Sequence, residues 1–111
     1  MDADRARELL AAERTRIERA LSRLGPIDDS EEADEFDPAN RGSDLYQDEF
    51  DEGRRQELEF DLAALERAEA RLSDGTYGLS VESGEPIPDR RLEALPTSER
   101  TIEEEERFRG R

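Results

Sequence analysis

DGTYGLSVESGEPIPDRRLEALPTSERTIEEEE, residues 74–106, is the stretch of this chain that carries the most structural information. It is rich in Gly, Pro, Asp and Ser, the residues that favour turns, and its apolar residues are scattered between them. It also holds two pairs of polar residues that are each separated by two positions: Ser80 with Ser83, and Thr101 with Glu104. The stretch therefore predicts a small, turn-rich knuckle at the C-terminal end of the chain.

Two phrases in this stretch resemble the zinc finger of the DksA/TraR family of transcription regulators: Tyr77-Gly78 followed by Gly84 and Ile87, and Arg90-Arg91-Leu92-Glu93-Ala94 followed by Pro96. In that family, two Cys-x-x-Cys pairs hold the metal. The resemblance places Ser80, Ser83, Thr101 and Glu104 at the four ligand positions. It implies a C4-type zinc-finger regulator in a variant that lacks all four zinc-ligand cysteines.

These four side chains are poor ligands for the zinc that the family would lead us to expect. Structural zinc sites use thiolate or imidazole donors in a tetrahedral arrangement, and the chain has no Cys and no His. We therefore expect a metal-free knuckle with no cofactor, in which the hydroxyls of Ser80, Ser83 and Thr101 bond turn backbone. Because small zinc modules draw folding energy from their metal, apolar packing against a helix end has to replace it. The residues expected to supply this packing are Tyr77, Leu79, Val81, Ile87, Leu92, Leu95 and Ile102.

The N-terminal part of the chain has the periodicity of two helices. Apolar residues seven positions apart in residues 4–24 (Leu10, Ile17, Leu24) predict one helix that ends at Gly25-Pro26. A second helix is expected from an N-cap at Ser43 to about Ser73, with its seam on Leu58, Leu62, Leu65 and Leu72. The fold class is mainly α: an antiparallel two-helix coiled-coil hairpin over residues 1–73, then a degenerate zinc-finger-like knuckle with a short helix over 74–111.

The loop between the helices, residues 25–42, is acidic and forms the tip of the hairpin. Its end resembles the family's tip pattern, Asp-x-x-Asp-x-Ala, with Asp37 kept and with Asn40 and Gly42 in place of the second Asp and the Ala; Arg41 lies between them. The resemblance implies that this tip enters the secondary channel of bacterial RNA polymerase. It also makes Arg54 and Arg55 candidates for contacts with the channel rim. The acidic run is more often a solvated loop than a Ca²⁺ or Mg²⁺ site, because it lacks the spacing of an EF-hand.

Composition limits the other classes of function. The 111 residues include 32 acids against 17 Arg, a net charge of −15, which disfavours direct binding to a nucleic-acid backbone. No apolar run has the length of a signal peptide or a membrane span, so we expect a cytoplasmic protein. With no Cys, no His and no phosphate-binding loop, we expect no enzyme.

Two functions remain at the level of sequence. The first is a noncatalytic, zinc-independent regulator of the DksA/TraR type, monomeric rather than dimeric, that binds RNA polymerase. The second is a diverged coiled-coil interaction or oligomerisation module that no longer binds polymerase. It would use the exposed apolar residues expected on the second helix: Leu45, Tyr46, Phe50 and Phe60.

Overall fold

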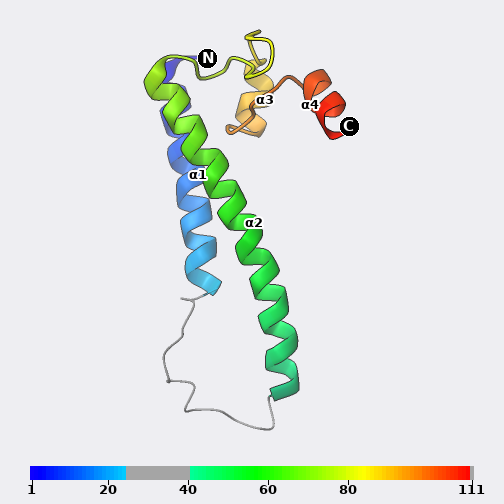
Figure 1. Ribbon diagram of the computed structural model, residues 1–111. Helices are drawn as coiled ribbons and strands as arrows, with labels where there is room; N and C mark the ends of the chain where they lie inside the picture. Colours follow the sequence, from blue (N-terminus) through cyan, green and yellow to red (C-terminus); the bar gives the residue numbers. More distant parts are fainter. Residues whose placement is uncertain (25–40, 111) are drawn as a thin grey trace.

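The computed structural model describes residues 1–24 and 41–110, with the side chains of residues 1–24 and 50–110. It contains four helices in this part of the chain: α1 (Ala3–Leu24), α2 (Arg41–Asp74), α3 (Asp89–Ala94) and α4 (Ile102–Arg109) (Figure 1). Among the described residues, β pairing is limited to an isolated antiparallel bridge between Leu79 and Pro86. The prediction of a mainly α-helical fold is confirmed.

The two long helices lie side by side and run in opposite directions (Figure 1). Arg14 of α1 pairs with Glu69 of α2 at 2.6 Å, and Arg55 of α2 donates to the carbonyl of Leu24 at 3.5 Å, so early residues of α1 meet late residues of α2. Their shared core consists of Leu10, Ile17, Leu65 and Ala68, with Leu21, Leu62, Leu72 and Tyr77 packed against it. Each fully buried Leu or Ile contributes roughly 1.5–3 kcal/mol to folding, which makes this seam the main apolar core.

Helix α2 is the longer of the two and runs past the end of α1 (Figure 1). It begins at Arg41, so the prediction that Ser43 caps the helix is wrong, and Arg41 and Gly42 belong to its first turn rather than to the loop. Neither arginine nor glycine is sterically barred from a first helical turn, and a single cap residue fixes a helix start only to within a residue or two. Asp37 and Asn40 lie outside the described residues.

A glycine ends α2 and starts the C-terminal module, which we define as residues 75–110. Gly75 has φ of 80°, and the N–H groups of Thr76 and Tyr77 both return to the carbonyl of Arg71, at 2.9 and 3.1 Å. This left-handed turn satisfies the carbonyl at the helix end, as glycine commonly does after a helix. It directs the chain back toward the hairpin, where α3 and α4 lie beside the paired helix ends (Figure 1).

The C-terminal module has a small core of its own, made of Ile87, Leu92 and Pro96. The prediction that seven apolar residues hold it is wrong for four of them, because Leu79, Val81, Leu95 and Ile102 are 38–52% exposed. The module is short and folded into turns, so its backbone cannot bring all seven side chains to one interior. Much of what joins its segments is polar instead.

Ion pairs fix the module on the hairpin. Arg5 of α1 makes a two-pronged contact with Glu93 of α3, at 2.8 and 2.6 Å. Arg67 and Arg71 of α2 both reach Glu99, which lies between α3 and α4. The Tyr77 hydroxyl also donates to the carbonyl of Pro96 at 2.8 Å. The base of the hairpin therefore holds the module from both long helices. Within the described part of the chain, no helix combines the length and the apolar character needed to cross a membrane.

Candidate functional site

The first pair of predicted ligand positions forms a tight turn held by hydroxyl oxygens. The Ser80 hydroxyl oxygen accepts the N–H groups of Glu82 and Ser83 at 3.0 and 3.2 Å, and the Ser83 hydroxyl oxygen accepts the N–H of Glu85 at 3.2 Å. Ser80 is 5% exposed. The expectation that these hydroxyls bond turn backbone is confirmed. The turn is thus complete without a metal.

The second pair begins α4 with a reciprocal pair of hydrogen bonds. The Thr101 hydroxyl oxygen accepts the N–H of Glu104 at 3.2 Å, while a Glu104 carboxylate oxygen accepts the N–H of Thr101 at 2.9 Å. This capping box satisfies two of the N–H groups that a helix start leaves without partners. The sequence contains the signal for a capping box, Thr-x-x-Glu before a helix. The interpretation of these two residues as a lost ligand pair did not use that signal.

Glu104 connects the two pairs. Hydrogen bonds from the Ser83 hydroxyl, the Thr101 N–H and the Ser80 hydroxyl lower the pKa of the Glu104 carboxyl to about 2, against the opposing effect of burial. Its side chain is 5% exposed. The structure therefore brings Ser80, Ser83, Thr101 and Glu104 together around one buried carboxylate, which we call the Glu104 cluster.

The donor set of this cluster does not fit zinc. Three neutral hydroxyls and one carboxylate replace the thiolates or imidazoles that such a site uses. Oxygen atoms of Ser80 and Glu104 already accept backbone N–H groups, which occupies lone pairs that a metal would need. Across residues 1–24 and 41–110, no group of three His, Cys, Asp or Glu side chains could hold a metal ion.

The chemistry of the cluster is structural rather than catalytic. A carboxyl with a pKa of about 2 is ionised at neutral pH and accepts hydrogen bonds. It neither takes up nor releases a proton near pH 7, which a general acid or base has to do. The Glu104 side chain is buried although most acids of the chain are polar surface residues by composition, because the fold closes around it in a way that composition does not reveal.

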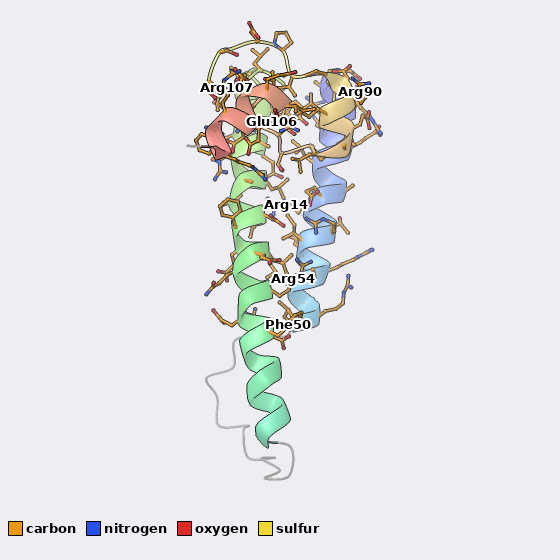
Figure 2. All side chains as sticks on the ribbon, turned by 90° about the vertical axis from the view of Figure 1, so that its right-hand side faces the viewer. Arg14, Phe50, Arg54, Arg90, Glu106 and Arg107 are labelled. Atoms are coloured by element: carbon orange, nitrogen blue, oxygen red, sulfur yellow. The ribbon has the colours of Figure 1, made fainter. Side chains whose placement is uncertain are left out.

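Arg54 lies far along α2 from the module (Figure 2), and Arg55, the next residue, lies beside the end of α1. Arg54 pairs with Glu57 one turn away at 3.1 Å and remains 41% exposed. Arg55 reaches the last carbonyl of α1. Phe50, beyond them, is 70% exposed, whereas the side chains of Arg41, Leu45 and Tyr46 lie outside the described residues.

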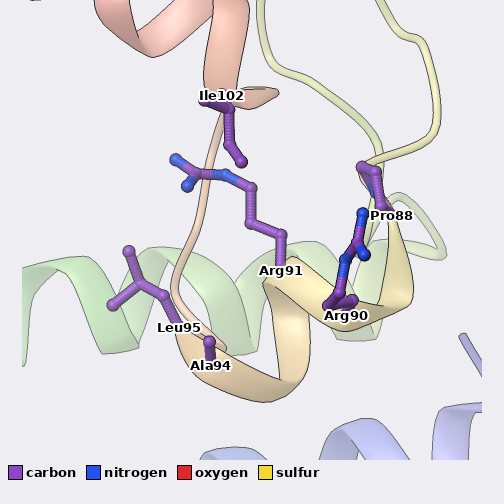
Figure 3. A pocket seen from close by; sticks show the side chains of 6 residues that line it. All are labelled: Pro88, Arg90, Arg91, Ala94, Leu95 and Ile102. Atoms are coloured by element: carbon purple, nitrogen blue, oxygen red, sulfur yellow. The ribbon is translucent and has the colours of Figure 1, made fainter.

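A shallow hollow of about 310 Å³ opens on the module between α3 and the start of α4 (Figure 3). Its lining combines an arginine pair, Arg90 and Arg91, with Pro88, Ala94, Leu95 and Ile102. Arg91 donates to the carbonyl of Arg100 at 2.9 Å and so ties α3 to the segment before α4. The lining residues contain no acid and no nucleophile, so the hollow offers no catalytic group of its own.

Comparison with known proteins gives partial matches in sequence and a nearly complete one in structure. No family model matches the chain. It is 42% identical over 50 residues, 45% of its length, to the RNA polymerase-binding transcription factor DksA of Caulobacter vibrioides, and 43% identical over 42 residues, 38% of its length, to the general stress protein 16O of Bacillus subtilis. These alignments span 35% and 26% of the two relatives, so the chain covers about a third or less of their length.

The structural likeness extends further. The fold matches that of the transcription factor DksA2 from Pseudomonas aeruginosa with a TM-score of 0.70 and 28% identity, over 97% of this chain and 80% of the other. A match over 97% of this chain includes both the helical pair and the C-terminal module. The chain belongs to the DksA/TraR family, as a variant without the four zinc-ligand cysteines.

Proposed function

We propose that this protein is a noncatalytic transcription regulator that binds bacterial RNA polymerase by inserting its helical hairpin into the secondary channel. The observation that carries the proposal is the structural likeness to DksA2 along nearly the whole chain. One relative, DksA of Caulobacter vibrioides, is an RNA polymerase-binding transcription factor. The antiparallel packing of α1 and α2 supports the same function, because a helix pair with a continuous core is stiff enough to carry a loop into a narrow channel.

The proposed contacts follow from where the residues stand on the hairpin. The tip residues Asp37, Asn40, Arg41 and Gly42 would enter the channel, with Asp37 supplying the charge that the family's tip keeps. Arg54 is the better candidate for a rim contact, since it is partly exposed and its partner Glu57 is only three residues away. Arg55 would first have to break its hydrogen bond to the carbonyl of Leu24 at the end of α1. The protein would act as a monomer.

We further propose that this regulator works without zinc. The support is the donor chemistry of the Glu104 cluster, whose oxygens are engaged in hydrogen bonds. Binding to polymerase should therefore be the same in the presence of a strong zinc chelator, and peroxide should leave it unchanged because the chain has no thiol.

The test is binding of the full chain to core RNA polymerase from the same source, with a Gre-type cleavage factor as competitor. We expect competitive binding that Asp37→Ala weakens by about tenfold, the effect of losing one charged contact. Asp29→Ala, which removes an acid from the same run without touching the tip motif, is the matched control and should bind like the parent.

Two results would count against this function. Binding that persists in the presence of excess competitor would place the contact outside the secondary channel. No binding at micromolar concentration would favour the alternative of an interaction module, and sedimentation should then reveal a stable dimer instead of a monomer.

A further inference from the structure

We propose that residues 99 and 100, which lie between α3 and α4, couple the docking of the C-terminal module on the hairpin to the closure of the module itself. The Glu99 side chain contacts helix α2, whereas Arg100, the next residue, contacts the turn at residues 80–83, α3 and α4. We call these two residues the 99–100 junction. The proposal concerns a conformational coupling within the protein, and it holds or fails independently of polymerase binding.

The Glu99 carboxylate holds the junction on the hairpin. Arg67 donates to both of its oxygens, at 3.1 and 3.0 Å, and Arg71 adds a third hydrogen bond at 3.0 Å. The side chains of Glu99 and Arg71 are 21% and 14% exposed, so little water is at hand to replace these bonds. A two-pronged arginine contact fixes orientation as well as distance, because two planar groups have to face each other. The contact therefore constrains where the chain between α3 and α4 runs along α2.

The backbone of the same residue reaches the turn at residues 80–83. The Val81 N–H donates to the carbonyl of Glu99 at 2.9 Å. Because this carbonyl and the carboxylate belong to one residue, a shift of Glu99 away from α2 also disturbs the bond from Val81. The following residue of the turn, Glu82, accepts a hydrogen bond from Nε of Arg100 at 3.2 Å. The turn is thus attached to both residues of the junction.

Arg100 joins the remaining parts of the module. Its carbonyl accepts a hydrogen bond from Nε of Arg91, on α3, at 2.9 Å. Its guanidinium lies over the ring of Phe108, on α4, 3.8 Å from the ring centre, and 3.9 Å from the carboxylate of Glu105. The Arg100 side chain is 20% exposed, and a cation–π contact is stronger where water is largely excluded. The turn, α3 and α4 therefore converge on one residue.

The contact of Arg5 with Glu93 offers a comparison, because it joins the hairpin to the module through a different segment. It is also two-pronged, at 2.8 and 2.6 Å, and the Arg5 side chain is about as exposed as that of Arg67, 47% against 50%. Glu93 lies within α3, not in the junction. Loss of Arg5 or of Arg67 removes the same charge and the same kind of contact, but loss of Arg67 acts on the junction.

The first experiment compares Arg67→Gln with Arg5→Gln by amide hydrogen exchange of the full chain. We expect Arg67→Gln to speed exchange of the Val81 amide by about threefold to tenfold, because a weaker hold on Glu99 loosens the carbonyl that Val81 uses. Arg5→Gln should change this rate by less than about twofold. Amides around Leu65 in the hairpin core should stay protected in both variants, which separates local opening from failure to fold. Equal exchange of the Val81 amide in the two variants would overturn the proposal.

The second experiment asks whether the two residues of the junction act as one unit. Arg100→Gln removes the contacts with Glu82 and Phe108 and should also speed exchange of the Val81 amide. In a coupled junction, Arg67→Gln and Arg100→Gln open the same structure, so their double variant should exchange within about twofold of the faster single variant. Substitutions that act independently would instead multiply their factors. A double variant whose rate follows that product would show that docking and closure are separate, and would contradict the proposal.

Discussion

At the scale of single residues, Glu104 shows how a buried carboxylate can complete the start of a helix. We propose that this position is one where the family pattern carries a thiolate, which is a negatively charged ligand. In this chain it carries a carboxylate with a pKa of about 2, which remains negative but is matched to hydroxyl and N–H donors rather than to a metal. Its hydrogen bonds with Thr101 complete the cap at the start of α4.

This pKa predicts a particular dependence of stability on pH. The folded-state pKa of Glu104 lies below its ordinary value of 4.5, so its contribution is fully present above about pH 4.5 and is lost as the pH falls toward 2. The difference in unfolding free energy between the parent and Glu104→Gln should therefore be largest near pH 7 and should shrink between pH 4.5 and 2. Denaturant unfolding at several pH values measures it. A difference that stays constant across this range would contradict the assigned pKa.

Glycine positions give a second prediction for single residues. Gly78 has φ of 84°, and an added Cβ would lie 3.5 Å from a methyl group of Leu92, so Gly78→Ala should destabilise the protein by about 1–2 kcal/mol through backbone strain. Gly53 lies inside α2 with open space around it, so Gly53→Ala should stabilise by about 0.5–1 kcal/mol. Chemical denaturation of the two variants should give shifts of opposite sign; a shift of the same sign would show that strain at Gly78 is not the controlling factor.

At the scale of elements, periodicity predicted the hairpin core and could not predict the module. Leu10, Ile17, Leu58 and Leu65 are 0–2% exposed because a seven-residue repeat keeps them on one helix face, and this is a local property of sequence. The module has no such repeat. Its contacts join residues far apart in the chain, such as Arg5 with Glu93, and no spacing rule in a single sequence reveals such a pair. Arginines and acids are abundant, so charge alone does not select partners.

The hairpin core can be tested with two substitutions on α2. Leu65 is fully buried, so Leu65→Ala should lower the unfolding free energy by about 2–5 kcal/mol through lost burial and a cavity. Phe60 is 72% exposed, so Phe60→Ala should change it by less than about 0.5 kcal/mol despite removing a larger side chain. Thermal or denaturant unfolding distinguishes them. A large loss of unfolding free energy for Phe60→Ala would mean that this side chain is buried in solution, for example in the interface of a dimer.

At the scale of the whole molecule, the charges that make the chain strongly acidic also orient its two parts. The net charge of −15 opposes a compact state through self-repulsion. Arginines at the hairpin base offset part of this by holding acids of the module: Arg5 holds Glu93, while Arg67 and Arg71 hold Glu99. The pKa of both acids is lowered, in Glu93 chiefly by the hydrogen bond from Arg5 and in Glu99, against its burial, by the hydrogen bond from Arg67. The module is thus positioned by electrostatics more than by apolar contact.

The Arg5–Glu93 contact and the contacts of Glu99 with Arg67 and Arg71 should respond differently to salt. Glu99 is 21% exposed and serves two arginines, one of which, Arg71, is only 14% exposed, so Glu99→Gln leaves a poorly solvated charge and should cost about 1 kcal/mol. Glu93 is 42% exposed, so Glu93→Gln should cost less. The unfolding free energy is measured for both variants and the parent at low salt and at about 1 M NaCl, where the Debye screening length is about 3 Å. Because salt also relieves the overall repulsion, the relevant quantity is each variant's difference from the parent. That difference should largely vanish in high salt for Glu93→Gln and persist for Glu99→Gln, because salt screens the exposed pair more than the partly buried one. The opposite ranking would mean that the contact of Arg5 with Glu93, and not the contacts of Glu99, sets the position of the module.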